Sequence, residues 1–168
     1  MAEQAPVTGK RKRVVMLADS AERERLIAAH PQAALVSESQ PLRANLSVME
    51  NITMVLQFRT NTYLGEANDV AWELLTLLGR TDCAEKRDPD LDYEERFVAK
   101  LLRAVVLTPP LILIDRPAQL LPDCNYPFFL QRTLAPLDGL PSKRCTATRK
   151  ASDSHSTTDQ TTPMTSAR

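Results

Sequence analysis

The stretch LILID, residues 111–115, constrains the fold of this chain more than any other feature. Pro109 and Pro110 stand directly before it, and proline cannot continue a helix into it. An apolar run without alternation is typical of a strand that is buried on both faces of a parallel sheet. We therefore expect a central strand that delivers the carboxylate of Asp115 to the carboxyl end of the sheet, with Arg116 directly behind it.

Two further strands are expected near the N-terminus, at residues 14–18 and 33–37. Residues 20–30 lie between them and are expected to form a helix, because the side-chain oxygen of Asp19 or Ser20 can accept its first free amides. A strand-helix-strand order predicts an α/β fold with a parallel sheet.

The segment between the second and third strands has helical spacing of its apolar residues. One helix is expected behind Ser47, and a second over residues 66–78 carries Trp72, which we expect to pack in the core or in the helical subdomain. A third begins at Asp92, which forms a predicted capping box with Glu95. The chain therefore has the pattern of an α/β sheet with a helical insertion.

The composition excludes several classes of function. The 168 residues include 21 basic and 21 acidic side chains, so the net charge of zero favours neither nucleic acid nor an anionic membrane as a partner. No apolar run approaches the roughly 18 residues of a membrane span, so we expect no direct membrane insertion. The three cysteines show neither a metal-ligand nor a disulfide spacing, so we expect no metal site and a cytoplasmic location.

Residues 46–123 resemble the ATP-binding subunit of ABC transporters. LSVMENI, at 46–52, is similar to the L-T-V-x-E-N-V stretch that opens the helical subdomain of that family. Residues 91–105 keep the spacing of the segment that runs from L-S-G-G-Q to A-R-A-L, and LILIDRP resembles the Walker B strand L-L-L-L-D-E-P. The resemblance implies an incomplete P-loop NTPase-like parallel sheet with an ABC-type helical subdomain at about 46–105.

The elements that bind the phosphates in that family are altered or missing here. The sequence has no G-x-x-x-x-G-K-[ST] loop, and Glu22 and Glu24 lie near the start of the first helix, where they would repel a triphosphate. Glu38 stands at the position of the family's Q-loop glutamine. Gln40, two residues later, is a candidate for a displaced Q-loop residue.

The signature and Walker B motifs are also degenerate. The residues in place of L-S-G-G-Q are Leu91, Asp92, Tyr93, Glu94 and Glu95. Three acids would face a phosphate, and a like-charge pair about 4 Å apart costs roughly 4 kcal/mol at an effective dielectric constant of about 20. Asp115 keeps the position that supports Mg²⁺ and is interpreted as vestigial. Arg116 replaces the glutamate that acts on the attacking water, and it is a candidate for an ion pair or an interface.

These features predict three parts: a mobile N-terminus at 1–12, a degenerate ABC ATPase-like domain at 13–141 and a disordered Ser/Thr-rich tail at 142–168. The favoured hypothesis is a non-catalytic subunit or interaction module of an ABC transporter, of lipid or organic-solvent type, with no ATP or Mg²⁺ bound. Its expected partners are an ABC permease or a competent ABC ATPase at the inner face of the membrane. The alternatives are residual nucleotide binding and a decayed fragment without function.

Overall fold

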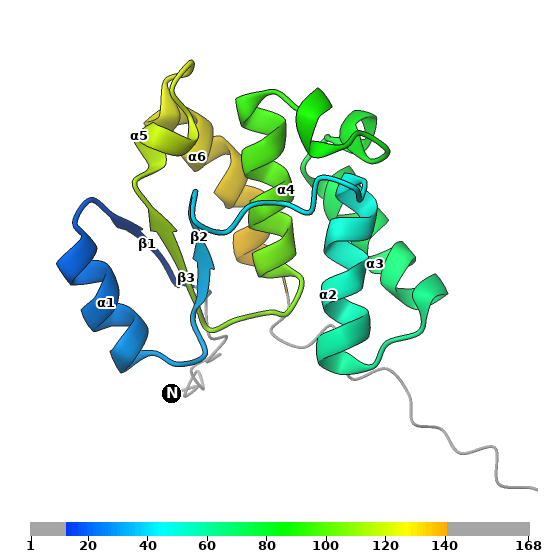
Figure 1. Ribbon diagram of the computed structural model, residues 1–168, viewed down its shortest axis with the longest axis horizontal. Coiled ribbons are helices and arrows are strands. Elements are labelled where there is room, and N and C mark those ends of the chain that lie inside the picture. Colours follow the sequence, from blue (N-terminus) through cyan, green and yellow to red (C-terminus); the bar gives the residue numbers. More distant parts are fainter. Residues whose placement is uncertain (1–12, 141–168) are drawn as a thin grey trace, which may run out of the picture.

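The computed structural model describes residues 13–140. The predictions for 1–12 and 142–168 lie outside these residues. Three strands form one parallel sheet in the order β1-β3-β2: β1 (Arg13–Leu17), β3 (Leu111–Asp115) and β2 (Ala34–Val36). The last strand of the described chain is thus the central one (Figure 1).

Strand β3 is buried along its whole length, as its apolar sequence predicts. Ile112 and Ile114 belong to the larger core of the molecule, whereas Leu111 and Leu113 belong to a smaller core on the opposite face. Successive side chains of a strand point to opposite faces, so an unbroken apolar run is what a central strand with cover on both sides needs.

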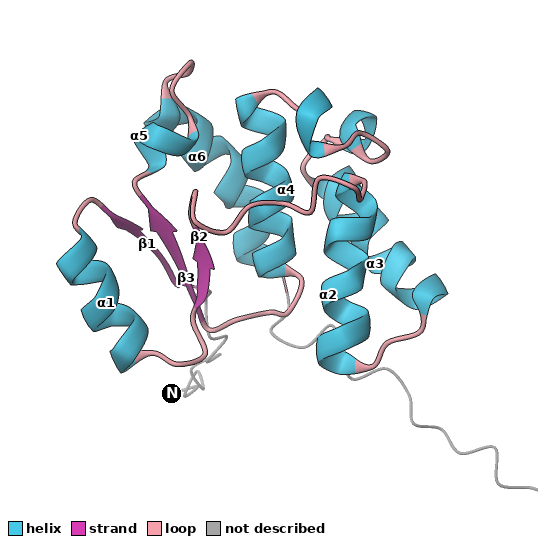
Figure 2. Ribbon diagram, in the orientation of Figure 1, coloured by secondary structure: helices cyan, strands magenta, loops and turns pink. Residues whose placement is uncertain are grey.

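Helices cover both faces of the sheet (Figure 2). Helix α1 (Ser20–Ala29) lies on the side of the smaller core, where Leu26 packs against it. Helices α4 (Tyr93–Val105) and α6 (Tyr126–Leu134) cover the other side. Beyond α4 lie α2 (Val48–Thr60) and α3 (Leu64–Leu77), and the short α5 (Pro117–Leu120) follows β3.

The ends of the central helices are fixed by local sequence signals. Ser47 and Glu50 form a capping box at the start of α2, and Asp92 and Glu95 form another at the start of α4. After α3 the chain turns at Gly79, whose φ of 64° is costly for residues with a Cβ atom. The capping box predicted at Asp92 is confirmed.

The prediction for Trp72 is wrong, because its side chain is 49% exposed. The buried face of α3 is made by Ala67, Ala71, Leu74 and Leu75. Two alanines on this face let α2 approach closely, and Trp72 follows Ala71 about 100° further around the helix. Two alanines and two leucines, and not the tryptophan, therefore form the buried face of α3.

Candidate functional site at the carboxyl end of the sheet

Asp115 ends β3 and its side chain is buried, with the whole residue only 2% exposed. Strands β1 and β3 are parallel and Leu17 pairs with Asp115, so both strands end at the same edge of the sheet. Helix α1 begins just beyond β1 at this edge. Arg23, in the second turn of α1, donates from Nη1 to Oδ2 of Asp115 at 3.0 Å.

Arg116 adds a second cation to the same carboxylate oxygen. Its Nη2 lies 3.4 Å from Oδ2 of Asp115, and its backbone amide donates to the carbonyl of Leu17 at 2.8 Å. The backbone of Arg116 is left-handed, with φ 44° and ψ 64°, a conformation that side chains with a Cβ atom rarely adopt. The ion pair expected for Arg116 is therefore present. Its role at an interface stays a prediction.

The two guanidinium groups disfavour a Mg²⁺ ion at Oδ2 of Asp115. A divalent cation at Oδ2 of Asp115 would lie beside two guanidinium groups, and each would repel it by several kcal/mol even at an effective dielectric constant of about 20. Two buried polar atoms at this place have no partner among the described residues, Oδ1 of Asp115 and Nε of Arg116. The carboxylate is compensated by the protein itself.

Acidic side chains also lie at the start of α1. The side chain of Asp19 accepts from the amide of Ala21 at 3.2 Å, and Glu22 lies in the first turn. The first amides of a helix and the positive end of its dipole bind anions, but the carboxylates of Asp19 and Glu22 already lie at this end of α1. An incoming phosphate would meet negative charge.

Gln40 and Glu38 are both exposed in the turn that follows β2. The backbone carbonyl of Gln40 accepts from Nη2 of Arg103 at 2.8 Å, and the next carbonyl, of Pro41, accepts from Nη1 at 2.7 Å. Arg103 thus ties the loop to α4 through the main chain. The use of the Gln40 side chain as a displaced Q-loop residue stays a prediction.

The altered signature residues are engaged with their own helix. Oδ1 of Asp92 accepts from the amide of Glu95 at 2.7 Å, and Oε2 of Glu95 accepts from the amide of Asp92 at 3.1 Å. Leu91 is buried and Tyr93 is 45% exposed, with its ring 5.7 Å from the guanidinium carbon of Arg96. The first-turn amide of Glu95 is therefore already taken.

Two of the three signature acids are also neutralised by cations. Arg80 bonds to Glu94, and Lys86 bonds to Oε1 of Glu95. The hydrogen bond to Glu95 raises the pKa of Lys86. Repulsion of a phosphate by these acids is thus weaker than their formal charges indicate.

Arg23 is the residue of this site that the sequence does not reveal. It lies 92 positions before Asp115 and meets it only because β1 pairs directly with β3. The position of Arg23 in the helix after β1 does not predict its contact with Asp115, because that contact depends on which strand lies next to β1.

Other chemistry is limited in the described part of the chain. No group of three or more His, Cys, Asp or Glu side chains there could hold a metal ion. Burial, followed by the nearby charge of Glu95, raises the pKa of the Cys83 thiol to about 11, so this cysteine is a poor nucleophile at neutral pH. Among residues 13–140, no helix has the length and apolar character needed to cross a bilayer.

Neither a protein-family model nor a curated protein matches the sequence. The fold is similar to a solved structure described as the dimeric structure of a post-hydrolysis state of the ATP-binding cassette MJ0796 bound to ADP and Pi. The TM-score is 0.58 at 15% identity, over 79% of this chain and 70% of that one. The likeness shows the fold: an α/β chain with a small parallel sheet, consistent with an incomplete P-loop NTPase-like domain.

Proposed function

We propose that this chain is a non-hydrolysing, ABC ATPase-like subunit or interaction module. The observation that carries the proposal is the pairing of Asp115 with Arg23 and Arg116 at the carboxyl end of β3. In an ABC-type ATPase the corresponding acid supports Mg²⁺, and here guanidinium groups supply the compensating charge. The similarity of fold to the ATP-binding cassette MJ0796 supports the scaffold on which this pairing is built.

Hydrolysis would need three groups that the described residues do not supply together. A metal at Asp115 would lie beside the two guanidinium groups that pair with Oδ2, although Oδ1 has no partner among the described residues. A general base would have to stand beside it, and the arginine at position 116 cannot accept a proton at neutral pH. Phosphates would require free helix amides, and a capping acid occupies one first-turn amide at the start of α1 and one at the start of α4.

A module of this kind would act by binding other proteins. We propose an ABC permease or a competent ABC ATPase as the partner, at the inner face of a membrane, in a transporter of the lipid or organic-solvent type. Affinity purification from the native host followed by mass spectrometry tests this directly. An ABC permease or ATPase should copurify in stoichiometric amount, and its consistent absence would count against the assignment.

Thermal unfolding with and without Mg²⁺-ATP tests the loss of nucleotide chemistry. A ligand at about 100 times its Kd stabilises the native state by about 2.7 kcal/mol, so a micromolar site would shift the melting temperature clearly at millimolar ATP. We expect no Mg²⁺-dependent shift. A shift that disappears in Asp115→Ala but persists in the exposed-site control Asp123→Ala would refute the proposal.

A further inference from the structure

The outer edge of β1 carries backbone groups that have no partner within residues 13–140. Strand β1 pairs with β3 on one side, and no described strand lies on its other side. The carbonyl of Leu17 accepts from the amide of Arg116, so the backbone groups of Leu17 face β3. The backbone groups of successive strand residues point to alternate sides, so those of Val14 and Met16 point outwards.

The side chains along this edge are apolar and partly open to solvent. Met16 is 56% exposed, and Val14 and Val15 are half-buried. Beside Met16 lies a hollow of about 530 Å³, lined mainly by Ala18, Pro117, Ala118, Tyr126 and Pro127. An exposed apolar edge strand of this kind can pair with a strand of another chain.

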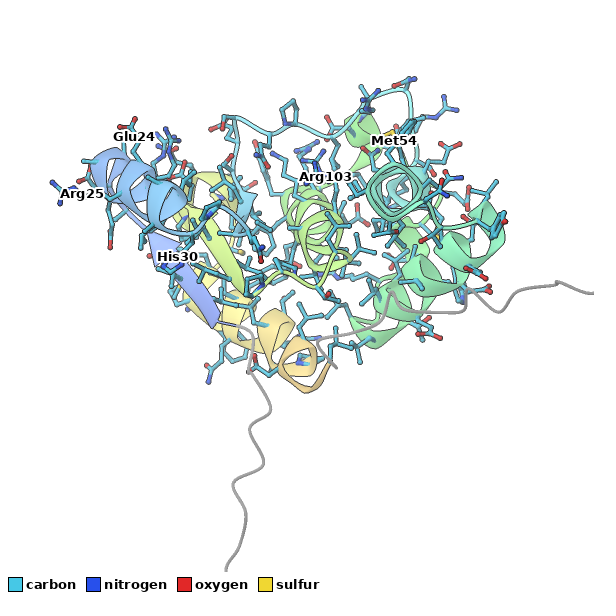
Figure 3. The ribbon with its side chains drawn as sticks, turned by 90° about the horizontal axis from the view of Figure 1, so that it is seen from below. Glu24, Arg25, His30, Met54 and Arg103 are labelled. Carbon is cyan, nitrogen blue, oxygen red and sulfur yellow. The ribbon has the colours of Figure 1, made fainter. Side chains whose placement is uncertain are left out.

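Of the two edges of the sheet, β1 is the more open one. At the other edge, β2 has only three residues, α4 packs against it, and Nζ of Lys100 donates to the carbonyl of Ser37 just behind it. Short strands and lysine side chains are common means of protecting a sheet edge. Figure 3 shows β1 beside α1, where Glu24 and Arg25 project into solvent, and α2 with Met54 lies away from them.

The charges in the sequence on either side of β1 differ in sign. Residues 10–12 are lysine, arginine and lysine, whereas Asp19 and Glu22 are the first charged residues after the strand. Two antiparallel copies of β1 would bring the basic end of each copy near the acidic end of the other, and opposite charges attract. A parallel pair would bring like charges together. The sequence around β1 is thus complementary to itself in the antiparallel direction.

We infer that β1 is a self-association edge, where a second copy of this chain pairs antiparallel about a two-fold axis at Val15. In this register Val14 of each copy lies opposite Met16 of the other, and the two residues exchange both of their N–H···O=C bonds. These bonds use only the outward groups, so the pairing of β1 with β3 is unchanged. Opposite residues share a face, so the exposed side chain of Met16 is covered by Val14 of the other copy.

A second copy fits this edge better than the chain's own C-terminal residues. Residues 141–168 contain five basic and two acidic side chains, and Met164 is the only large apolar residue among them. They therefore match neither the apolar strand nor the basic residues before it. The inference goes beyond the proposed function and does not depend on it, because it concerns the contact between identical chains.

Sedimentation analysis of the full chain tests the association. It should show a monomer–dimer equilibrium with a Kd of roughly 10–100 µM, since a single strand edge buries less area than a standard interface. Met16→Lys should weaken the dimer about tenfold, because it places a charge in the middle of the edge. Phe58→Lys makes the same kind of change on α2, at a residue that is 82% exposed, and should leave the dimer unchanged. Circular dichroism checks that both variants fold.

Single cysteines test the register in a chain that carries Cys124→Ser and Cys145→Ser. Val15→Cys should form a disulfide-linked dimer under mild oxidation, because facing residues of a non-hydrogen-bonded pair have Cα atoms about 4.5 Å apart. Met16→Cys is the matched control. It faces Val14 of the other copy and not itself, so it should cross-link roughly fivefold less.

Three results would each overturn the inference: a chain that stays monomeric up to about 1 mM, a dimer that Phe58→Lys weakens as much as Met16→Lys, and equal cross-linking of the two cysteine variants. Slow hydrogen exchange at the amides of Val14 and Met16 in the monomer would also overturn it, because it would assign the edge to residues 141–168. None of these results depends on nucleotide or on a transporter partner. The failure of this inference and the failure of the proposed function are therefore separable.

Discussion

Asp115 illustrates how one side chain can keep its position in a fold while its surroundings change its chemistry. The strand that carries it is fixed by burial on both faces, which does not depend on what the acid binds. Its charge is compensated by Arg23, whose side chain is 24% exposed, and by Arg116, whose side chain is 39% exposed. The carboxylate therefore contributes to holding α1 against the end of the sheet.

Asp115→Ala should lower the free energy of unfolding by about 2 kcal/mol, because it leaves two arginines without their buried acid. Arg23→Gln should cost less, since Arg116 stays beside the carboxylate. Urea denaturation measures both. An acid kept for metal binding at the expense of stability would behave in the opposite way, and its replacement by alanine would raise the midpoint.

Lys100→Met should show a stability difference from the parent chain that depends on pH. The pKa of Lys100 in the native state lies below its ordinary value of 10.5. Below the native pKa both states hold the proton, and the cost of the buried charge is present in full. Between the two pKa values the unfolded chain binds more protons, so the parent gains stability as pH rises.

Urea titrations of both chains from neutral pH towards 10.5 measure this effect. The stability of the parent should improve relative to Lys100→Met as pH increases. A difference that is constant over this range would show that the charge of Lys100 is not strained in the fold.

At the scale of single elements, local chemistry decides where the helices begin. The start of α4 has an acid in each position that the capping box needs, and the signature glycines of an ABC ATPase have no counterpart there. Helix α1 differs, because it has a cap at Asp19 but no buried residue. It depends on Leu26 and on the ion pair of Arg23 for its place on the sheet.

Asp92→Ala should destabilise the protein by about 1 kcal/mol, the usual cost of losing an N-cap side chain. The effect should appear as a lower urea midpoint with an unchanged denaturant slope. Asp90→Ala, at an exposed neighbouring acid, is the matched control and should have little effect. Equal losses in both variants would mean that negative charge near this helix matters and that the cap does not.

Arg23→Gln should increase the hydrogen-exchange rates of the α1 amides about fivefold and leave those of α4 unchanged, because only α1 loses an anchor. Exchange followed by mass spectrometry resolves the two helices. A uniform increase over both would indicate global destabilisation and would contradict a local role for the ion pair.

The elements themselves could be predicted from the sequence because their signals are local. The apolar run of β3, the capping box of α4 and the turn at Gly79 each lie within a few residues. The pairing of Arg23 with Asp115 could not be predicted, because it depends on which strands are neighbours. The burial expected for Trp72 is wrong because size favours burial only in general, whereas α3 packs through Ala67, Ala71, Leu74 and Leu75.

At the scale of the whole molecule, one larger core joins the sheet to α2 and α3, and a smaller one lies beneath α1. Within the described residues, both cores run from residue 14 to residue 140. We expect a chain of residues 13–141 to unfold in a single cooperative transition with the same urea midpoint as the full chain. Circular dichroism measures this, and a lost or broadened transition would show that the flanking segments contribute to the fold.

The order β1-β3-β2 also has a consequence for synthesis on the ribosome. Strands β1 and β2 leave the exit tunnel early, but within residues 13–140 each pairs only with β3, which is made some 75 residues after β2. Until then their backbone groups and apolar side chains have no partner, and such segments are prone to pair with other chains. A nascent chain halted before Leu111 should therefore bind ribosome-associated chaperones. Once residues 111–115 have left the exit tunnel, β3 can insert between β1 and β2, and this association should end.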